Sequence, residues 1–113
     1  MEQLLERLRK FRDERNWSQF HTPKDLAISV TIEAAELLEL FQWRKEDSAP
    51  DSKLIEAAEN EVADVFLYLL LLCDGLGINL VSAADRKITR NEARFPVASA
   101  WGVAKPDDES SSE

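Results

Sequence analysis

Residues 51–77 read DSKLIEAAENEVADVFLYLLLLCDGLG, and this stretch decides the fold. We expect one helix over residues 51–76, ended by Gly75 and Gly77, because glycine readily takes the left-handed conformation found at helix ends. Residues 65–73 make this helix apolar on nearly every side. An exposed helix is apolar along one stripe only. This helix should therefore be covered on several sides, by the rest of its own chain and by a second chain.

Three further helices are predicted around this stretch. Large apolar residues recur every three to four positions over residues 2–15, which is the spacing of one helix face. Thr22, followed by a proline, signals the start of a helix that should run to about residue 43. Asn79 is suited to cap a helix over residues 80–95, which a proline ends. No stretch alternates as a half-exposed strand does. The prediction is an all-α fold, a four-helix bundle that forms oligomers.

The composition excludes several classes of protein. The chain of 113 residues carries 14 Lys and Arg against 22 Asp and Glu, a net charge of −8. This balance argues against a broad basic surface that holds a nucleic acid polymer. One cysteine, Cys73, and one histidine, His21, exclude an internal disulfide and a multi-histidine zinc site. The apolar run over residues 65–73 is too short to span a membrane, and the charged N-terminus does not resemble a signal peptide. We expect a cytoplasmic protein.

The domain boundary is predicted near the end of the chain. Residues 1–97 should form one domain, and residues 98–113 should form a disordered acidic tail. The segment GVAKPDDESSSE, residues 102–113, is polar and shows no helical spacing. It holds four of the acids and one lysine, so a good part of the negative charge should lie outside the domain.

Two acidic pairs lie inside apolar parts of the predicted helices. Glu33 and Glu36 are three residues apart, and so are Glu61 and Asp64, so each pair shares a helix face. The surrounding segments contain no lysine or arginine. Burying carboxylates without partners costs several kcal/mol each, by order of magnitude, and a divalent cation removes that cost. All-oxygen ligands favour Mg²⁺ or Mn²⁺ over zinc. A solvent-exposed acidic face is the alternative for these pairs.

These acids belong to a longer pattern. Glu33-Ala-Ala-Glu36, followed after 24 residues by Glu61-Val-Ala-Asp64, resembles the ExxE…ExxD signature of the MazG-like all-α nucleoside triphosphate pyrophosphohydrolases. WSQFHTPKDLAISVTIEAAELLELFQW, residues 17–43, resembles the dCTP pyrophosphatase branch of that family, as does KITRNEARFP, residues 87–96. The resemblance covers about residues 5–96.

The resemblance implies an activity and its residues. The family binds Mg²⁺ at the triphosphate and directs water to the α-phosphorus, so dCTP or a modified dCTP would give dCMP and pyrophosphate, a housecleaning of the nucleotide pool. The metal ligands would be Glu33, Glu36, Glu61 and Asp64, with Glu36 also orienting the water as the catalytic residue. The matching substrate contacts are Trp17, His21, Trp43 and Tyr68 at the base and sugar, and Lys87, Asn91 and Arg94 at the phosphates. The family also implies a homodimer or homotetramer.

Alternatives remain open at this stage. The same chemistry on another nucleoside triphosphate, such as dUTP, fits the four acids equally well. A non-enzymatic helical oligomerisation module, with acids that are only solvated, fits the helices. Trp17 and Trp43 also suit a core or an interface, and the basic segment around Lys87 also suits a solvated helix face. A nucleotide rather than a nucleic acid polymer or a membrane is the expected partner.

Overall fold

The computed structural model describes residues 1–45 and 47–104, and within these ranges every regular element is a helix. The all-α prediction is confirmed, and all four predicted helices are present. In chain order the elements are α1 (Glu2–Glu14), the short 3₁₀ helix η1 (Trp17–Phe20), α2 (Pro23–Glu39), α3 (Ser52–Leu76), α4 (Leu80–Arg94) and α5 (Val97–Ala100).

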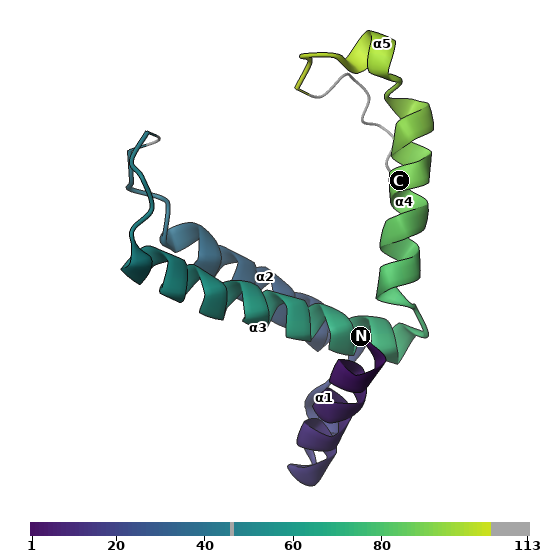
Figure 1. Cartoon of the computed structure of the whole chain (residues 1–113). Helices are drawn as coiled ribbons and strands as arrows, with labels where there is room; N and C mark the ends of the chain where they lie inside the picture. The colour runs from purple at the N-terminus through teal and green to yellow at the C-terminus, as the bar shows by residue number, and fades with distance from the viewer. Residues whose placement is uncertain (46, 105–113) are drawn as a thin grey trace. The chain divides into compact units, whose positions relative to one another are not determined.

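The chain divides into two compact units, the first spanning Met1–Ile78 and the second beginning at Asn79. In the first unit α2 and α3 run side by side in opposite directions, and α1 packs against α3 (Figure 1). The side chains that form its core come from α2 and α3, and they are Leu26, Leu70 and Leu71, with 3%, 3% and 7% of their surface exposed. The two longest helices therefore carry the core of this unit.

Side-chain caps fix the helix starts that the sequence predicted. The Thr22 hydroxyl accepts a hydrogen bond from the backbone N–H of Asp25 at 3.1 Å. The Asn79 side chain accepts one from the N–H of Ser82 at 3.0 Å. At the end of α3, Gly77 has a φ of 71°, a left-handed conformation that costs glycine nothing. These local groups satisfy backbone atoms that a helix leaves unpaired at its ends.

Two features near helix ends differ from the prediction. α2 ends at Glu39 rather than near residue 43, because the following N–H groups bond to carbonyls three residues back and tighten the chain into turns. The 3₁₀ helix η1 was not predicted. It follows Asn16, whose φ of 55° redirects the chain after α1. Such a redirection has no periodic signature in the sequence.

The second unit consists of α4 and α5, and none of the residues in these two helices is buried. The short helix α5 crosses the predicted domain boundary between residues 97 and 98. The part of the predicted acidic tail from residue 105 onward lies outside the described residues. Taken one at a time, the described helices are too short or too polar to cross a membrane, and α3 and α4 reach the required length and apolarity only as a bent pair.

Candidate functional site

Three of the four predicted metal ligands meet between α2 and α3. Glu33 comes from α2, and Glu61 and Asp64 come from α3. One carboxylate oxygen from each lies within 4.8 Å of the others, and all three residues are half-buried. We call this group the acidic cluster. It forms because two antiparallel helices bring their acidic pairs to the same level.

The fourth predicted ligand lies beside this group. Glu36 is exposed and does not belong to the three residues whose oxygens converge. Its negative charge nevertheless helps to raise the pKa of both Glu33 and Glu61. Glu36 is therefore close enough to interact with the cluster but remains more open to water.

The acidic cluster carries unbalanced negative charge. Partial burial is the main cause that raises the pKa of Glu33 and of Glu61, and the neighbouring carboxylates raise both further. Among the described residues, Glu61 Oε1 is buried and has no hydrogen-bond partner. A buried acceptor without a donor is costly, and it marks a place where a cation would stabilise the protein.

The donor set fits a magnesium ion. Mg²⁺ takes oxygen ligands at about 2.0–2.1 Å in octahedral geometry, so neighbouring ligands lie about 2.9 Å apart and opposite ligands about 4.2 Å apart. The three oxygens of the acidic cluster lie within 4.8 Å of one another, so rotations of the carboxylate side chains would bring them around one ion. Mn²⁺ accepts the same oxygen ligands. The residues present therefore fit the ion that the sequence predicted.

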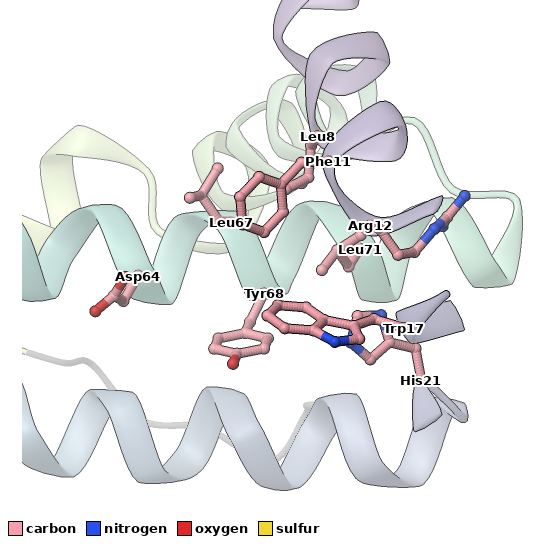
Figure 2. Close-up of a pocket in the computed structure, with 9 residues that line it drawn as sticks. All are labelled: Leu8, Phe11, Arg12, Trp17, His21, Asp64, Leu67, Tyr68 and Leu71. Carbon is pink, nitrogen blue, oxygen red and sulfur yellow. The ribbon is translucent and has the colours of Figure 1, made fainter. Parts of the chain in front are cut away.

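A cavity of about 220 Å³ opens next to the acidic cluster (Figure 2). Three of the predicted base and sugar contacts, Trp17, His21 and Tyr68, line it together with Asp64. The remaining wall comes from α1 and α3, through Leu8, Phe11, Arg12, Leu67 and Leu71. Asp64 belongs both to this cavity and to the acidic cluster, so an aromatic-lined space and a carboxylate group share one residue.

The aromatic wall of the cavity is held from α1. The rings of Phe11 and Trp17 meet edge to face, with centroids 5.7 Å apart and planes at 75°. Beside them, burial lowers the pKa of His21, and the positive charge of Arg12 lowers it further. His21 Nδ1 is buried and has no hydrogen-bond partner within residues 1–45 and 47–104. The imidazole is therefore neutral near pH 7 and offers hydrogen-bonding groups rather than charge.

The other predicted substrate contacts do not line this cavity. Trp43 follows α2 in a turn, and 87% of its surface is exposed. The predicted phosphate contacts lie on α4, in the second unit. Lys87 and Arg94 are exposed and Asn91 is half-buried. The Arg94 guanidinium lies 4.9 Å from the centre of the Phe95 ring.

Known proteins match this chain over most of its length. The model of the MazG-like family matches residues 28–107. The chain belongs to the MazG-like family. The match spans all four predicted metal ligands, whereas α1, Trp17 and His21 precede it. In this MazG-like chain both acidic pairs, on α2 and on α3, therefore lie within the segment that matches the family model.

Two curated relatives of this chain carry the same name. dCTP pyrophosphatase 1 of Rattus norvegicus is 36% identical over 100 residues, which is 84% of this chain and 58% of that protein. dCTP pyrophosphatase 1 of Homo sapiens is 36% identical over 92 residues, which is 77% of this chain and 54% of that protein. The chain therefore spans somewhat more than half the length of these relatives.

A solved structure supports the same fold. The crystal structure of a pyrophosphatase from Archaeoglobus fulgidus DSM 4304 matches this chain with a TM-score of 0.73 and 47% sequence identity. The match covers 85% of this chain and 92% of that chain.

Sequence reasoning missed the part that α1 plays in this MazG-like site. Leu8 and Phe11 were seen only as a periodic apolar face, and Arg12 was one cation among 14. The periodicity of α1 indicated a packed helix, but not the partner against which it packs. The three α1 residues line the cavity because α1 folds back onto α3, a contact between distant segments.

Proposed function

We propose that this chain is a Mg²⁺-dependent nucleoside triphosphate pyrophosphohydrolase that converts dCTP, or a modified dCTP, to the monophosphate and pyrophosphate. One observation carries the proposal: Asp64 lines the aromatic cavity and also belongs to the acidic cluster. A nucleotide has the matching chemistry, a flat base joined to a chain of phosphates that binds divalent ions. The names of the similar proteins, dCTP pyrophosphatase 1 and pyrophosphatase, support this reaction class.

The acidic residues divide the work according to their exposure. Glu33, Glu61 and Asp64 would hold the ion, because their oxygens converge and Glu61 Oε1 has no other partner in the described part of the chain. Bound Mg²⁺ would neutralise charge on the triphosphate and lower the pKa of bound water. Glu36, which is exposed beside the cluster, accepts the proton of the attacking water and orients it toward the α-phosphorus. Its exposure suits a group that must exchange protons with solvent.

The cavity binds the base and the sugar in this proposal. The Trp17 ring is already oriented by Phe11, so little freedom is lost when a base stacks on it. His21 is neutral and offers a hydrogen bond to the edge of the base. Tyr68 follows Asp64 by one helical turn on α3, which suits a contact to the sugar between the base and the metal-bound phosphates.

The remaining predicted contacts come from α4 and from the turn after α2. Lys87, Asn91 and Arg94 are spaced by four and three residues on one helix, so they share a face. We assign them to the phosphates, because two cations and an amide on one face match an anionic chain. Trp43 is assigned to the base pocket of the assembled oligomer, since in the single chain it is almost fully exposed.

The assembly is a homodimer or a homotetramer in this proposal. Monomeric proteins rarely expose large contiguous apolar areas, and a chain this short builds only a small core. The exposed large apolar residues on and near α2 and α3 include Ile28, Ile32, Leu38, Phe41, Trp43, Ile55 and Val62. A second copy would cover them. Light scattering should give twice or four times the chain mass, and a stable monomer at micromolar concentration would contradict the assembly.

A panel of nucleotides with product identification tests the reaction. The purified chain is incubated with Mg²⁺ and, in separate reactions, dCTP, a base-modified dCTP, dUTP and the ribonucleotides. We expect dCMP and pyrophosphate from dCTP at the highest kcat/KM. Release of dCDP and orthophosphate would contradict attack at the α-phosphorus, and a higher kcat/KM for dUTP would change the substrate. No hydrolysis of any nucleotide, and no thermal stabilisation by Mg²⁺ with nucleotide, would favour the oligomerisation module.

A further inference from the structure

α1 forms one wall of the cavity without being fixed by tight apolar packing. None of its residues is buried. A second cavity of about 280 Å³ lies along the same helix, and Leu8, Phe11 and Leu67 line both cavities. Both spaces are open to solvent, so few side chains pack around α1 along this side. Apolar contacts alone therefore leave the position of α1 on α3 loosely defined.

A polar contact defines that position. Arg9 on α1 donates two hydrogen bonds to Asp74 on α3, from Nη2 to Oδ1 and from Nε to Oδ2, the latter at 3.3 Å. Arg12 Nη1 lies 3.6 Å from the same Oδ2. The Asp74 side chain is only 18% exposed. Two parallel bonds between a guanidinium and a carboxylate fix orientation as well as distance. We call these three residues the ion-pair cluster.

Both arginines are also held on their own helix. Arg9 Nη1 donates to Glu6 at 2.6 Å, and Arg12 Nε donates to Asp13 at 2.8 Å. These bonds restrain both guanidinium groups within α1, which lowers the entropy lost when they pair with Asp74. Asp74 pairs with these two restrained cations. Its pKa lies below its ordinary value, chiefly because of the hydrogen bonds from Arg9.

The ion-pair cluster acts on the cavity through the position of α1 and through Arg12, which itself lines the cavity. Asp74 does not line the cavity. It fixes α1, which carries Phe11, and Phe11 contacts Trp17 at 5.7 Å. Trp17 opens η1, which follows α1 after two residues, so Trp17 must move with that helix. The opposite end of the cavity is Asp64, which belongs to α3 like Asp74 itself.

We infer that Asp74 is a positioning residue: by docking Arg9 and Arg12 it sets how far the Phe11–Trp17 wall stands from Asp64, and so how well the cavity fits its ligand. As regards the nucleotide, this inference rests on the proposed function. As regards the placement of Trp17, it stands independently, since it concerns the protein without ligand. It predicts that removing the charge of Asp74 weakens substrate binding while the metal site and the chemical step are kept.

The test compares Asp74→Asn with Glu56→Gln, which removes one negative charge from an exposed position on the same helix. The full chain is labelled with 5-fluorotryptophan, and the Trp17 ¹⁹F resonance is assigned with Trp17→Phe. In Asp74→Asn we expect the Trp17 resonance to shift or broaden, while those of Trp43 and Trp101 stay in place. In Glu56→Gln all three resonances should match the wild type.

Kinetics give the second measurement. With dCTP, Asp74→Asn should raise KM about five- to tenfold with kcat within about twofold, because the wall is displaced but the reacting groups are kept. The Mg²⁺ concentration for half-maximal activity should stay unchanged. Arg9→Lys, which keeps the charge but loses the paired bonds, serves if Asp74→Asn does not fold, and should raise KM in the same sense.

Two results would overturn the inference. An unchanged Trp17 resonance in a folded Asp74→Asn or Arg9→Lys variant would show that the ion-pair cluster does not place Trp17. A fall in kcat with KM unchanged would show an effect on the chemistry rather than on the cavity. If the wild type hydrolyses no nucleotide, the proposed function fails, and the ¹⁹F comparison still decides whether Asp74 positions the wall.

Discussion

α3 carries two groups of acids in opposite electrostatic surroundings. In the acidic cluster, Glu61 faces other carboxylates, and burial and its neighbours raise its pKa. In the ion-pair cluster, Asp74 faces two arginines, and the hydrogen bonds from Arg9 lower its pKa. Both acids are partly buried. The difference is the presence of a cation from the same chain.

This contrast separates an acid that stabilises the fold through an ion pair from acids that could bind a cation. A carboxylate paired with arginine is already neutralised, so it stabilises the folded chain and has little affinity left for metal. Unpaired carboxylates that converge destabilise the chain until a cation binds. Glu61 belongs to the unpaired carboxylates, because its Oε1 has no hydrogen-bond partner among the described residues. The predictions below compare the two clusters.

The largest expected effect is the loss of activity on neutralising the acidic cluster. Asp64→Asn or Glu61→Gln should lower kcat/KM for dCTP by about 100-fold or more, because a bound metal ion contributes several kcal/mol to the transition state. The fold should be kept, as measured by circular dichroism. Glu56→Gln is the matched control and should retain activity. A loss of less than about tenfold in the Asp64 and Glu61 variants would contradict their role as ligands.

Mg²⁺ should distinguish the two clusters by thermal unfolding. Saturation to a hundred times the dissociation constant stabilises a protein by about 2.7 kcal/mol, so the melting temperature of the wild type should rise clearly. Glu61→Gln should abolish this rise. Asp74→Asn should keep it, because its partners are arginines and not the ion. An equal response in both variants would show that the ion does not bind at the acidic cluster.

Stacking in the cavity should give the next effect. Trp17→Ala should raise KM for dCTP about tenfold, since stacking of a base on an aromatic side chain contributes about 1–3 kcal/mol. The metal dependence should not change. Trp101→Ala is the control, because Trp101 is exposed in the second unit and has no assigned role. Equal KM values for the two variants would show that the base does not bind in this cavity.

The ion-pair cluster should affect stability more than the acidic cluster does. Asp74→Asn should lower the melting temperature by about 3–5 °C, the scale of one well-placed but partly solvated ion-pair group. In metal-free buffer Glu61→Gln should leave the melting temperature unchanged or raise it, because a repulsive charge is removed. Differential scanning calorimetry measures both. A stabilised Asp74→Asn variant would contradict the docking role of the cluster.

The stability of the fold should change with pH in opposite directions at the two clusters, and this is the smallest of the expected effects. Glu61 has a raised pKa, so it stabilises the fold at pH values below its ordinary pKa of 4.5. This contribution is lost as the pH rises through the pKa of Glu61 in the folded chain. Asp74, with a lowered pKa, stabilises the fold above 3.8, and this contribution is lost as the pH falls through its folded-state value.

Metal-free melting curves from about pH 2 to 7 test these signs. The difference in melting temperature between Glu61→Gln and the wild type should become more positive as the pH rises. The deficit of Asp74→Asn should shrink as the pH falls below 3.8. Parallel curves for both variants would show that neither carboxylate has a shifted pKa in the folded chain.

Much of the fold was predictable because its signals are local. Thr22 and Asn79 cap helices within three residues of their own positions, and the left-handed Gly77 ends α3 where the sequence indicated. The acidic pairs were predictable for the same reason, since a spacing of three residues places both on one helix face. The end of α2 and the helix η1 were not, because weak turns leave no periodic pattern.

The candidate site was predicted only in part. Oxygens of Glu33, Glu61 and Asp64 converge, and Trp17, His21 and Tyr68 share a cavity with Asp64, while the roles of these residues remain predictions. The exposure of Trp43 and of Glu36 was not predicted, because a sequence pattern names a residue without its surroundings. The roles of the α4 residues as phosphate contacts remain predictions.

The sequence by itself determined the helices, their caps and the lack of local cations around the two acidic pairs. Only the tertiary structure decided which acids stay unpaired. Asp64 and Asp74 are both aspartates at the borders of one apolar run, and nothing local distinguishes them. The arginine that pairs with Asp74 lies 65 positions away in the chain. Charge pairing depends on distance in space, and α1 reaches Asp74 only after it folds onto α3.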